Sequence, residues 1–158
     1  MTISQACDPY QASTVAASAG PVELRLQRLL QLTGAGPEQS ISLAGPGGLD
    51  LMVSLCRAGH NRVECARQAT SAEADETSDL LILTGPPSGL GALTARTAPL
   101  LRDGGVLAAW LDRVEDDAAI RAALLIHGME ITTSTLDVAG GLAVIHRVWR
   151  GRGLARAG

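Results

Sequence analysis

Residues 40–68 read SISLAGPGGLDLMVSLCRAGHNRVECARQ, and this stretch decides the fold. Residues 40–44 are a short, mainly apolar run typical of a strand. The GPGG of residues 45–48 predicts a tight turn, because glycine tolerates backbone conformations that other residues avoid. Residues 49–58 place their apolar side chains on one helical face, and residues 62–66 begin a second strand. The order strand, glycine turn, helix, strand predicts the first unit of a doubly wound sheet.

The glycine turn is also the first candidate binding site. A helix that begins after such a turn presents free N–H groups and a partial positive charge. In doubly wound sheets this corner binds anionic groups of nucleotides and related ligands. Gly45, Gly47 and Gly48 are therefore candidate cofactor-binding residues. The alternative is a tight strand-to-helix turn that binds no ligand.

The stretch resembles the first motif of class I S-adenosylmethionine (SAM)-dependent methyltransferases, and the entry unit of nicotinamide and flavin Rossmann proteins. The methyltransferase motif has an acid at the end of the first strand and a glycine two places on, where this chain has Ile41 and Leu43. In both families an acid after the second strand holds the ribose hydroxyls, and here Arg67 stands in its place. Arg67, with Arg62, could instead meet the 2′-phosphate of NADP. The alternative for both is a solvated strand end.

Two later segments carry further resemblance. Residues 79–84, DLLILT, predict a central parallel strand buried on both faces. The following Gly85-Pro-Pro-Ser88 resembles the Asp/Asn-Pro-Pro-Tyr motif of amino-group methyltransferases, with Gly85 in place of the acceptor and Ser88 in place of the ring. Gly85 is therefore a candidate cofactor-site residue without a catalytic group, and a plain turn into a helix is the alternative. Residues 103–111 resemble the family's Gly-Gly turn and the strand that follows it.

The remaining segments complete an α/β pattern. Helices are predicted at residues 21–34, with Arg25 facing outward, at 89–102, interrupted at Pro99, and at 115–127, with Leu125 facing inward. Asp112 could face the cleft, and a cap of the last helix is the alternative. The turn at 103–105 leads to a strand at 106–111, and strands at 129–136 and 142–149 flank a turn at Gly140-Gly141. Class I methyltransferases close with such a hairpin, whose last strand is antiparallel. The polar residues 68–78 are interpreted as a loop, where a full methyltransferase has a third strand and another helix.

The sequence therefore predicts a Rossmann-like, doubly wound α/β fold, with a mostly parallel sheet and an antiparallel C-terminal strand. Residues 1–20, rich in Ala, Ser, Thr and Gln, are interpreted as a flexible tail. Residues 21–150 form the methyltransferase-like domain. Residues 151–158 form a short basic tail.

Composition excludes several classes of function. The chain has no lysine, which excludes a P-loop and lysine Schiff-base chemistry. A net charge of −3 and 2% aromatic residues argue against nucleic-acid binding. No apolar run approaches the ~20 residues that span a bilayer. The three cysteines form no CxxC and the three histidines show no metal-ligand spacing, so we expect no metal and a reduced, cytoplasmic setting. Cys65, on the second strand, is interpreted as a buried small hydrophobic residue.

The altered positions set the functional hypotheses. The resemblance implies SAM, but the acid after strand one, the ribose acid and the acceptor after residue 84 are all replaced. The leading hypothesis is a non-catalytic binding or scaffold module for a small molecule or a protein. The alternatives are a SAM-dependent methyltransferase for a small molecule, and an NADP-type nucleotide binder, and whether the chain is an enzyme stays open. An enzyme should leave a pocket over residues 45–48, whereas a scaffold would fill it with Leu43 and Met52. A homo-oligomer, in which a neighbouring chain supplies the missing segment, also stays open.

Overall fold

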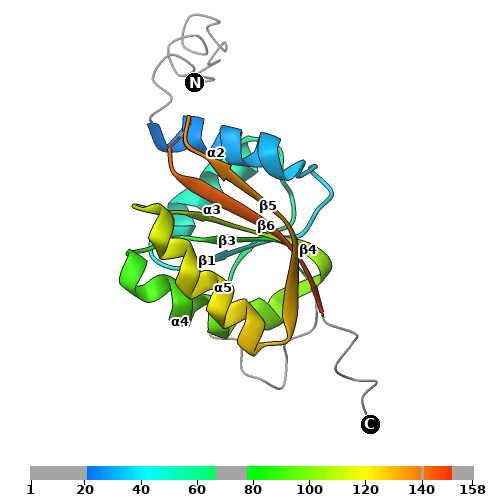
Figure 1. The fold of residues 1–158 in the computed structure, drawn as a ribbon. Helices are drawn as coiled ribbons and strands as arrows, with labels where there is room; N and C mark the ends of the chain where they lie inside the picture. Colours follow the sequence, from blue (N-terminus) through cyan, green and yellow to red (C-terminus); the bar gives the residue numbers. More distant parts are fainter. Residues whose placement is uncertain (1–20, 67–77, 140, 151–158) are drawn as a thin grey trace, which may run out of the picture.

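The computed structural model describes residues 21–66, 78–139 and 141–150, which form one six-stranded sheet with helices on both faces (Figure 1). The predicted tails at residues 1–20 and 151–158 lie outside the described residues, as do residues 67–77. The elements in chain order are α2 (Pro21–Thr33), β1 (Ile41–Ala44), α3 (Gly48–Arg57), β2 (Val63–Cys65), β3 (Ser78–Leu83), α4 (Pro87–Thr97), η1 (Ala98–Leu100), β4 (Leu101–Trp110), η2 (Val114–Asp116), α5 (Asp117–Ile126), β5 (Met129–Asp137) and β6 (Ala143–Arg150).

The strand order is β2-β1-β3-β4-β6-β5. The first four strands in this order are parallel, and β6 runs antiparallel between β4 and β5. This confirms the predicted mostly parallel sheet with an antiparallel C-terminal strand. The chain leaves β1 toward β2 and returns on the other side of β1 to form β3, so the direction of winding reverses between β1 and β3. In open α/β sheets ligands bind beside the carboxyl ends of the strands at such a reversal.

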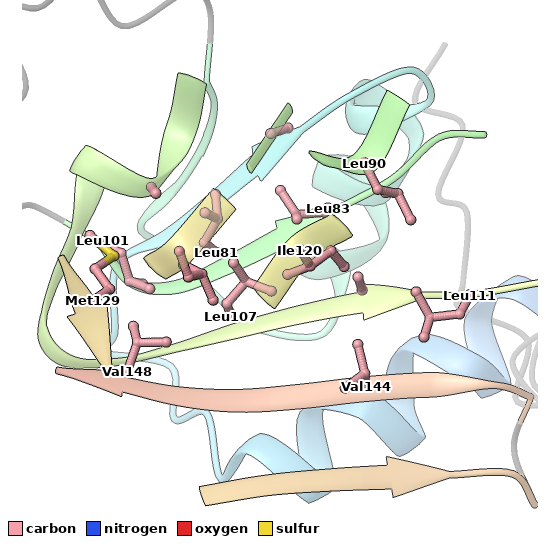
Figure 2. Close-up of a cluster of buried hydrophobic side chains, with 14 residues drawn as sticks. Leu81, Leu83, Leu90, Leu101, Leu107, Leu111, Ile120, Met129, Val144 and Val148 are labelled. Carbon is pink, nitrogen blue, oxygen red and sulfur yellow. The ribbon is translucent and has the colours of Figure 1, made fainter. Parts of the chain in front are cut away.

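Two hydrophobic clusters lie on the two faces of the sheet. On one face α2 and α3 contribute Leu29 and Leu55. On the other face α4 and α5 contribute Leu90 and Ile120, as Figure 2 shows. Among the described residues, no helix has both the length and the apolar character that crossing a bilayer requires.

Strand β3 shows why this segment is central. Leu81 and Leu83 enter the cluster beneath α4 and α5, whereas Leu80 and Ile82 enter the cluster beneath α2 and α3. Successive side chains of a strand point to opposite faces, so a continuous apolar run supplies both clusters at once. The prediction from DLLILT is confirmed.

The segment from Ala98 to Gly105 differs from its prediction. Helix α4 ends at Thr97, and a short 3-10 turn carries Pro99, which cannot donate a helical N–H bond. Strand β4 then starts at Leu101 rather than at residue 106, and the expected turn at residues 103–105 lies inside it. The register of β4 against β3 is irregular here. Ser78 pairs with Leu101 whereas Leu80 pairs with Val106, so β4 has more residues than β3 between these two pairs.

The start of α5 also differs from its prediction. Asp112 is exposed and is not the cap. Instead the carboxylate of Asp116 accepts a hydrogen bond from the backbone N–H of Arg113 at 2.9 Å, which closes the 3-10 turn η2 before the helix. Leu125 was expected to face inward, but it is 73% exposed near the C-terminal end of α5.

Candidate functional site

The glycine turn between β1 and α3 lies at the carboxyl edge of the sheet, at the reversal between β1 and β3. Gly47 is the N-cap of α3 with φ +79°, and the space where its side chain would stand is open. Gly48 begins the helix and is buried, with Leu43 and Cys65 next to the position a Cβ would take. The sequence therefore forms the predicted turn, with Gly47 as its open residue and Gly48 as its packed one.

Gly45 approaches the chain itself. Its φ is +108°, and a Cβ there would overlap the backbone carbonyl of Thr84, just after β3. The Thr84 hydroxyl donates to the carbonyl oxygen of Pro46 at 2.6 Å, and the Thr84 N–H donates to the Ala44 carbonyl at 2.8 Å. The carboxyl ends of β1 and β3 are thus joined directly, and Gly45 is required for that approach.

A cavity of about 500 Å³ opens beside this junction. The turn, the first turns of α3, the ends of β3 and β4, and the start of α2 all contribute to it. Its lining consists of Val22, Glu23, Arg25, Pro46, Gly47, Asp50, Leu51, Ser54, Thr84 and Trp110. Its size and its place at the carboxyl ends of the strands are those of small-molecule sites in α/β proteins.

The charge of the cavity wall comes from helices α2 and α3. The guanidinium carbon of Arg25 lies 5.5 Å from the centroid of the Trp110 ring, within cation–π range. Within the described part of the chain no carboxylate pairs with Arg25, and its buried Nε has no hydrogen-bond partner there. Glu23 and Asp50 bring two carboxylates to the same lining. The wall therefore offers an aromatic surface, a cation and two anions.

Leu43 and Met52, with which a scaffold was expected to fill the pocket, do not close the cavity. Leu43 is 1% exposed in the core beneath the turn, and Met52 packs against the same hydrophobic cluster. Neither side chain lines the cavity. The open pocket is the feature that was expected of an enzyme rather than of a scaffold.

The remaining candidate residues lie in different places. Gly85 is exposed, and a Cβ there would stand 3.3 Å from Pro46, so it packs against the turn. Arg67 lies outside the described residues. Arg62 directly precedes β2, and the parallel pairing of Ile41 with Val63 puts it at the amino edge of the sheet. Arg62 was predicted to join Arg67 at a 2′-phosphate, but it lies at the opposite edge of the sheet from the glycine turn.

Two interpretations of single residues are also corrected. Cys65 was interpreted as a buried small hydrophobic residue, but it is exposed on the edge strand β2. Asp112 was considered for the cleft, but it does not line the cavity. Among the described residues, no group of three or more His, Cys, Asp or Glu side chains is arranged to hold a metal ion.

Sequence reasoning missed Trp110, Arg25 and Thr84 as site residues. Trp110 ends a strand that was predicted as parallel, and the rule that carboxyl ends meet at one edge was a usable signal for it. Arg25 was interpreted as a solvent-facing helix residue. Its contact with Trp110 depends on how α2 crosses the sheet, for which the sequence carries no local signal.

The structure resembles solved methyltransferases. It matches ribosomal protein L11 methylase from Lactobacillus delbrueckii subsp. bulgaricus with a TM-score of 0.55 and 14% identity, over 81% of this chain and 77% of that chain. It matches a SAM dependent methyltransferase from Aquifex aeolicus with a TM-score of 0.53 and 13% identity, over 87% and 97%. A protein in the NADB-Rossmann superfamily from Streptococcus agalactiae gives 0.52 and 16%, over 80% and 68%.

The fold is the Rossmann-like fold of class I SAM-dependent methyltransferases. No protein-family model matches the sequence, and neither does any curated protein. At identities of 13–16% these likenesses establish the fold and leave the activity to be argued from the site.

Proposed function

We propose that this chain is a small-molecule-binding domain of the methyltransferase fold that does not itself transfer methyl groups efficiently. The observation that carries the proposal is the cavity beside Gly47, which combines the ring of Trp110 with Arg25, a cation that no carboxylate of the described residues pairs with. A ligand with an acidic group and a flat or apolar part fits that wall. Both kinds of contact are typical of small-molecule sites, in which a mainly apolar surface carries a few polar groups.

The fit to SAM is partial. Glu23, Arg25 and Asp50 supply charges of both signs, as a molecule with an ammonium and a carboxylate requires. No carboxylate follows β2 within the described residues, because the strand ends at Cys65 and the next residue, Ala66, is the last one described before residue 78. A lost charge-assisted hydrogen bond costs about 1.5–3 kcal/mol, or roughly tenfold or more in affinity. SAM would therefore bind weakly, held by α2, the glycine turn and Trp110.

The segment after β3 supports the lack of catalysis. Gly85 has no side chain to accept a hydrogen bond, Pro87 begins α4, and Ser88 is exposed. The Thr84 hydroxyl is already bonded to the Pro46 carbonyl. No side chain of residues 84–88 is therefore both free and suited to position an amino group for methyl transfer, in which positioning supplies most of the rate.

A SAM-dependent methyltransferase for a small molecule is the second candidate, and the open cavity favours it. The NADP-type alternative rests on Arg67 alone, which lies outside the described residues, because Arg62 lies at the opposite edge of the sheet. A protein ligand, a homo-oligomer and a reduced cytoplasmic setting stay predictions.

The test is calorimetric titration of the purified chain with SAM, its demethylated product and NADPH. Gly47→Val and Gly59→Val form a matched pair, because both glycines have positive φ and open space around a Cβ, yet Gly59 lies at the far end of α3. We expect binding of at least one compound, lost in Gly47→Val and kept in Gly59→Val, and weakened in Arg25→Met.

Three outcomes would revise the proposal. Methyl transfer from SAM to a screened small molecule, abolished by Gly47→Val, would make the chain an enzyme. NADPH binding that Arg67→Ala weakens would place it with the nucleotide binders. If none of the three compounds gave a binding signal, the proposed small-molecule site would be rejected, and a scaffold for a protein partner would be the remaining hypothesis.

A further inference from the structure

Four polar side chains meet beneath α5, and none of them lines the cavity. Asp117 and Arg121 come from α5, Ser134 from β5 and His146 from β6. Helix α5 packs over the part of the sheet that contains β5 and β6 (Figure 1). Ser134 and His146 are directly opposite each other in the antiparallel pair, so their side chains point to the same face, toward α5.

The four side chains form one chain of hydrogen bonds. The Ser134 hydroxyl oxygen lies 2.8 Å from Nδ1 of His146, and Nε2 of His146 lies 2.6 Å from Oδ1 of Asp117. Arg121 donates from Nε to Oδ2 of Asp117 at 2.6 Å and from Nη2 to the Ser134 hydroxyl oxygen at 3.0 Å. A hydroxyl, an imidazole and a carboxylate are thus connected in line, and a guanidinium touches the two ends.

The protonation states follow from these contacts. Burial raises the pKa of Asp117, but hydrogen bonds and charge from His146 and Arg121 outweigh it, and the pKa is lowered overall. Asp117 is therefore a carboxylate that accepts, so Nε2 of His146 carries the hydrogen. In the neutral imidazole, Nδ1 then has a lone pair to which the hydroxyl of Ser134 donates.

Exposure is divided unevenly along this chain. His146 is 0% exposed, whereas Ser134 is exposed on the edge strand β5. Ser134 therefore presents part of its surface to solvent, whereas His146 presents none. The buried imidazole needs a partner at each ring nitrogen, and the partner at Nδ1 comes from an exposed residue.

We propose that Ser134 is a nucleophile activated by His146, with Asp117 as the positioning residue, and that it reacts with small activated esters. The combination of nucleophile, base and orienting acid is recognised by geometry and roles and occurs in unrelated folds. In the serine-protease triad the serine faces Nε2, whereas here the ring is turned over. The requirement is the same, because one ring nitrogen is held protonated by a carboxylate and the other is free to accept.

The reaction balances with groups that are present. The hydroxyl proton of Ser134 passes to Nδ1 of His146 as the Oγ–acyl bond forms. The ester C–O bond breaks, and the leaving alcohol takes that proton. Water then attacks the acyl-serine, with Nδ1 accepting the water proton and returning it to Oγ. The guanidinium of Arg121 lies 3.0 Å from Oγ and so brings a positive charge to the place where the acyl group is attacked.

The test treats the full chain with a fluorophosphonate probe and measures the mass of the adduct. Oγ bonds to phosphorus, fluoride leaves, and the serine proton passes through Nδ1 to solvent. We expect one adduct, on Ser134, absent in Ser134→Ala and formed at least about 100-fold more slowly in His146→Gln, since a general base supplies rates of this order. Thr135→Ala is the matched control, because Thr135 is the exposed hydroxyl next along β5 and points to the opposite face.

Asp117→Asn tests the positioning role. An amide no longer fixes the tautomer of His146, so labelling should slow and its pH dependence should change, and Asp117→Glu should recover part of the rate. Circular dichroism confirms that each variant is folded. Labelling of wild-type Ser134 no faster than that of other exposed hydroxyls would overturn the proposal, and so would unchanged labelling in folded His146→Gln.

Discussion

The turn at the carboxyl edge and the cluster beneath α5 are built in opposite ways. At the edge, backbone atoms make the contact, where Gly45 lies against the Thr84 carbonyl and the Thr84 N–H bonds Ala44. Beneath α5, side chains make the contact, and His146 is bonded through both ring nitrogens. A backbone-built feature keeps its shape while the neighbouring side chains change. A side-chain-built feature depends on the identity of each member.

This difference explains how the chain can have the methyltransferase fold although its sequence departs from the methyltransferase motifs. The edge retains the strand, turn and helix of the methyltransferase fold at 14% identity to a matched methylase, because glycine and a parallel register are enough to form it. The acid and amide positions of the resembling motifs are not needed for that geometry. Their replacement therefore leaves the fold unchanged.

The largest effect should come from Gly45→Ala. The new Cβ would overlap the Thr84 carbonyl, and the φ of +108° is unfavourable for alanine. Overpacking typically costs about 1–3 kcal/mol, and a left-handed conformation roughly 1–2 kcal/mol more. We expect the free energy of unfolding in urea to fall by about 3 kcal/mol or more. Gly36→Ala is the control, because nothing lies near its Cβ position, and its stability should stay close to that of wild type.

If Gly45→Ala were as stable as Gly36→Ala, the two strand ends would have room to separate. The close backbone contact would then not be needed at the carboxyl edge, and the distinction between a backbone-built edge and a side-chain-built cluster would be wrong. A large loss would show that the turn tolerates no side chain at this position.

The second effect is the pH-dependent contribution of Asp117. Its pKa is lowered in the folded state, despite burial, by the bonds from His146 and Arg121. A lowered carboxyl pKa stabilises the fold above the unfolded-state pKa, and this stabilisation is lost as the pH falls through the folded-state pKa. Asp117→Ala should cost about 2 kcal/mol at neutral pH, since bonds to charged groups contribute about 1.5–3 kcal/mol and Arg121 is half exposed.

The measurement is urea unfolding from pH 7 downward. Wild type should lose stability on acidification more steeply than Asp117→Ala, so the two curves converge at low pH. Asp112→Ala, which removes an exposed carboxylate, should follow wild type. Parallel curves for wild type and Asp117→Ala would show that the cluster does not depend on the charge of Asp117.

The sequence predicted what local patterns control. The glycine turn, the face of α3 and the buried run of β3 each depend on a few adjacent residues. The start of β4 was misplaced because the pairing of Ser78 with Leu101 is long-range, whereas the Gly-Gly at 104–105 suggested a local turn. At the site, the turn was predicted, but the contact of Arg25 with Trp110 needs the path of α2 across the sheet.

The cluster was missed although part of it was accessible. A hairpin turn at Gly140-Gly141 was predicted, and residues equally distant from a turn face one another, which brings Ser134 close to His146. Asp117 and Arg121 are spaced as helix neighbours. Nothing in the sequence shows, however, that α5 packs its Asp117 onto His146.

A smaller effect should come from Gly47→Ala and Gly59→Ala. Both residues have positive φ, +79° and +98°, and neither has a neighbour near its Cβ position. Only backbone strain is then added, so each should cost about 1 kcal/mol in urea unfolding. A much larger loss for Gly47→Ala would mean that the cavity wall is as tightly packed as the Gly45 junction. Equal losses would leave the pair suited to separating ligand effects from stability effects.

The smallest effect should come from Thr84→Val, which probes the Gly45 junction from its other side. Valine keeps the shape of threonine and removes the hydroxyl that donates to Pro46 at 2.6 Å. A net hydrogen bond contributes about 0.5–1.5 kcal/mol, and an exposed acceptor can turn to water, so we expect the lower end of that range in urea unfolding. Thr132→Val, which removes an exposed 3.3 Å bond, is the control and should be close to neutral. If Thr84→Val lowered the free energy of unfolding as much as Gly45→Ala, the hydroxyl rather than the close backbone approach would hold the strand ends together. The carboxyl edge would then depend on a side chain, as the cluster beneath α5 does.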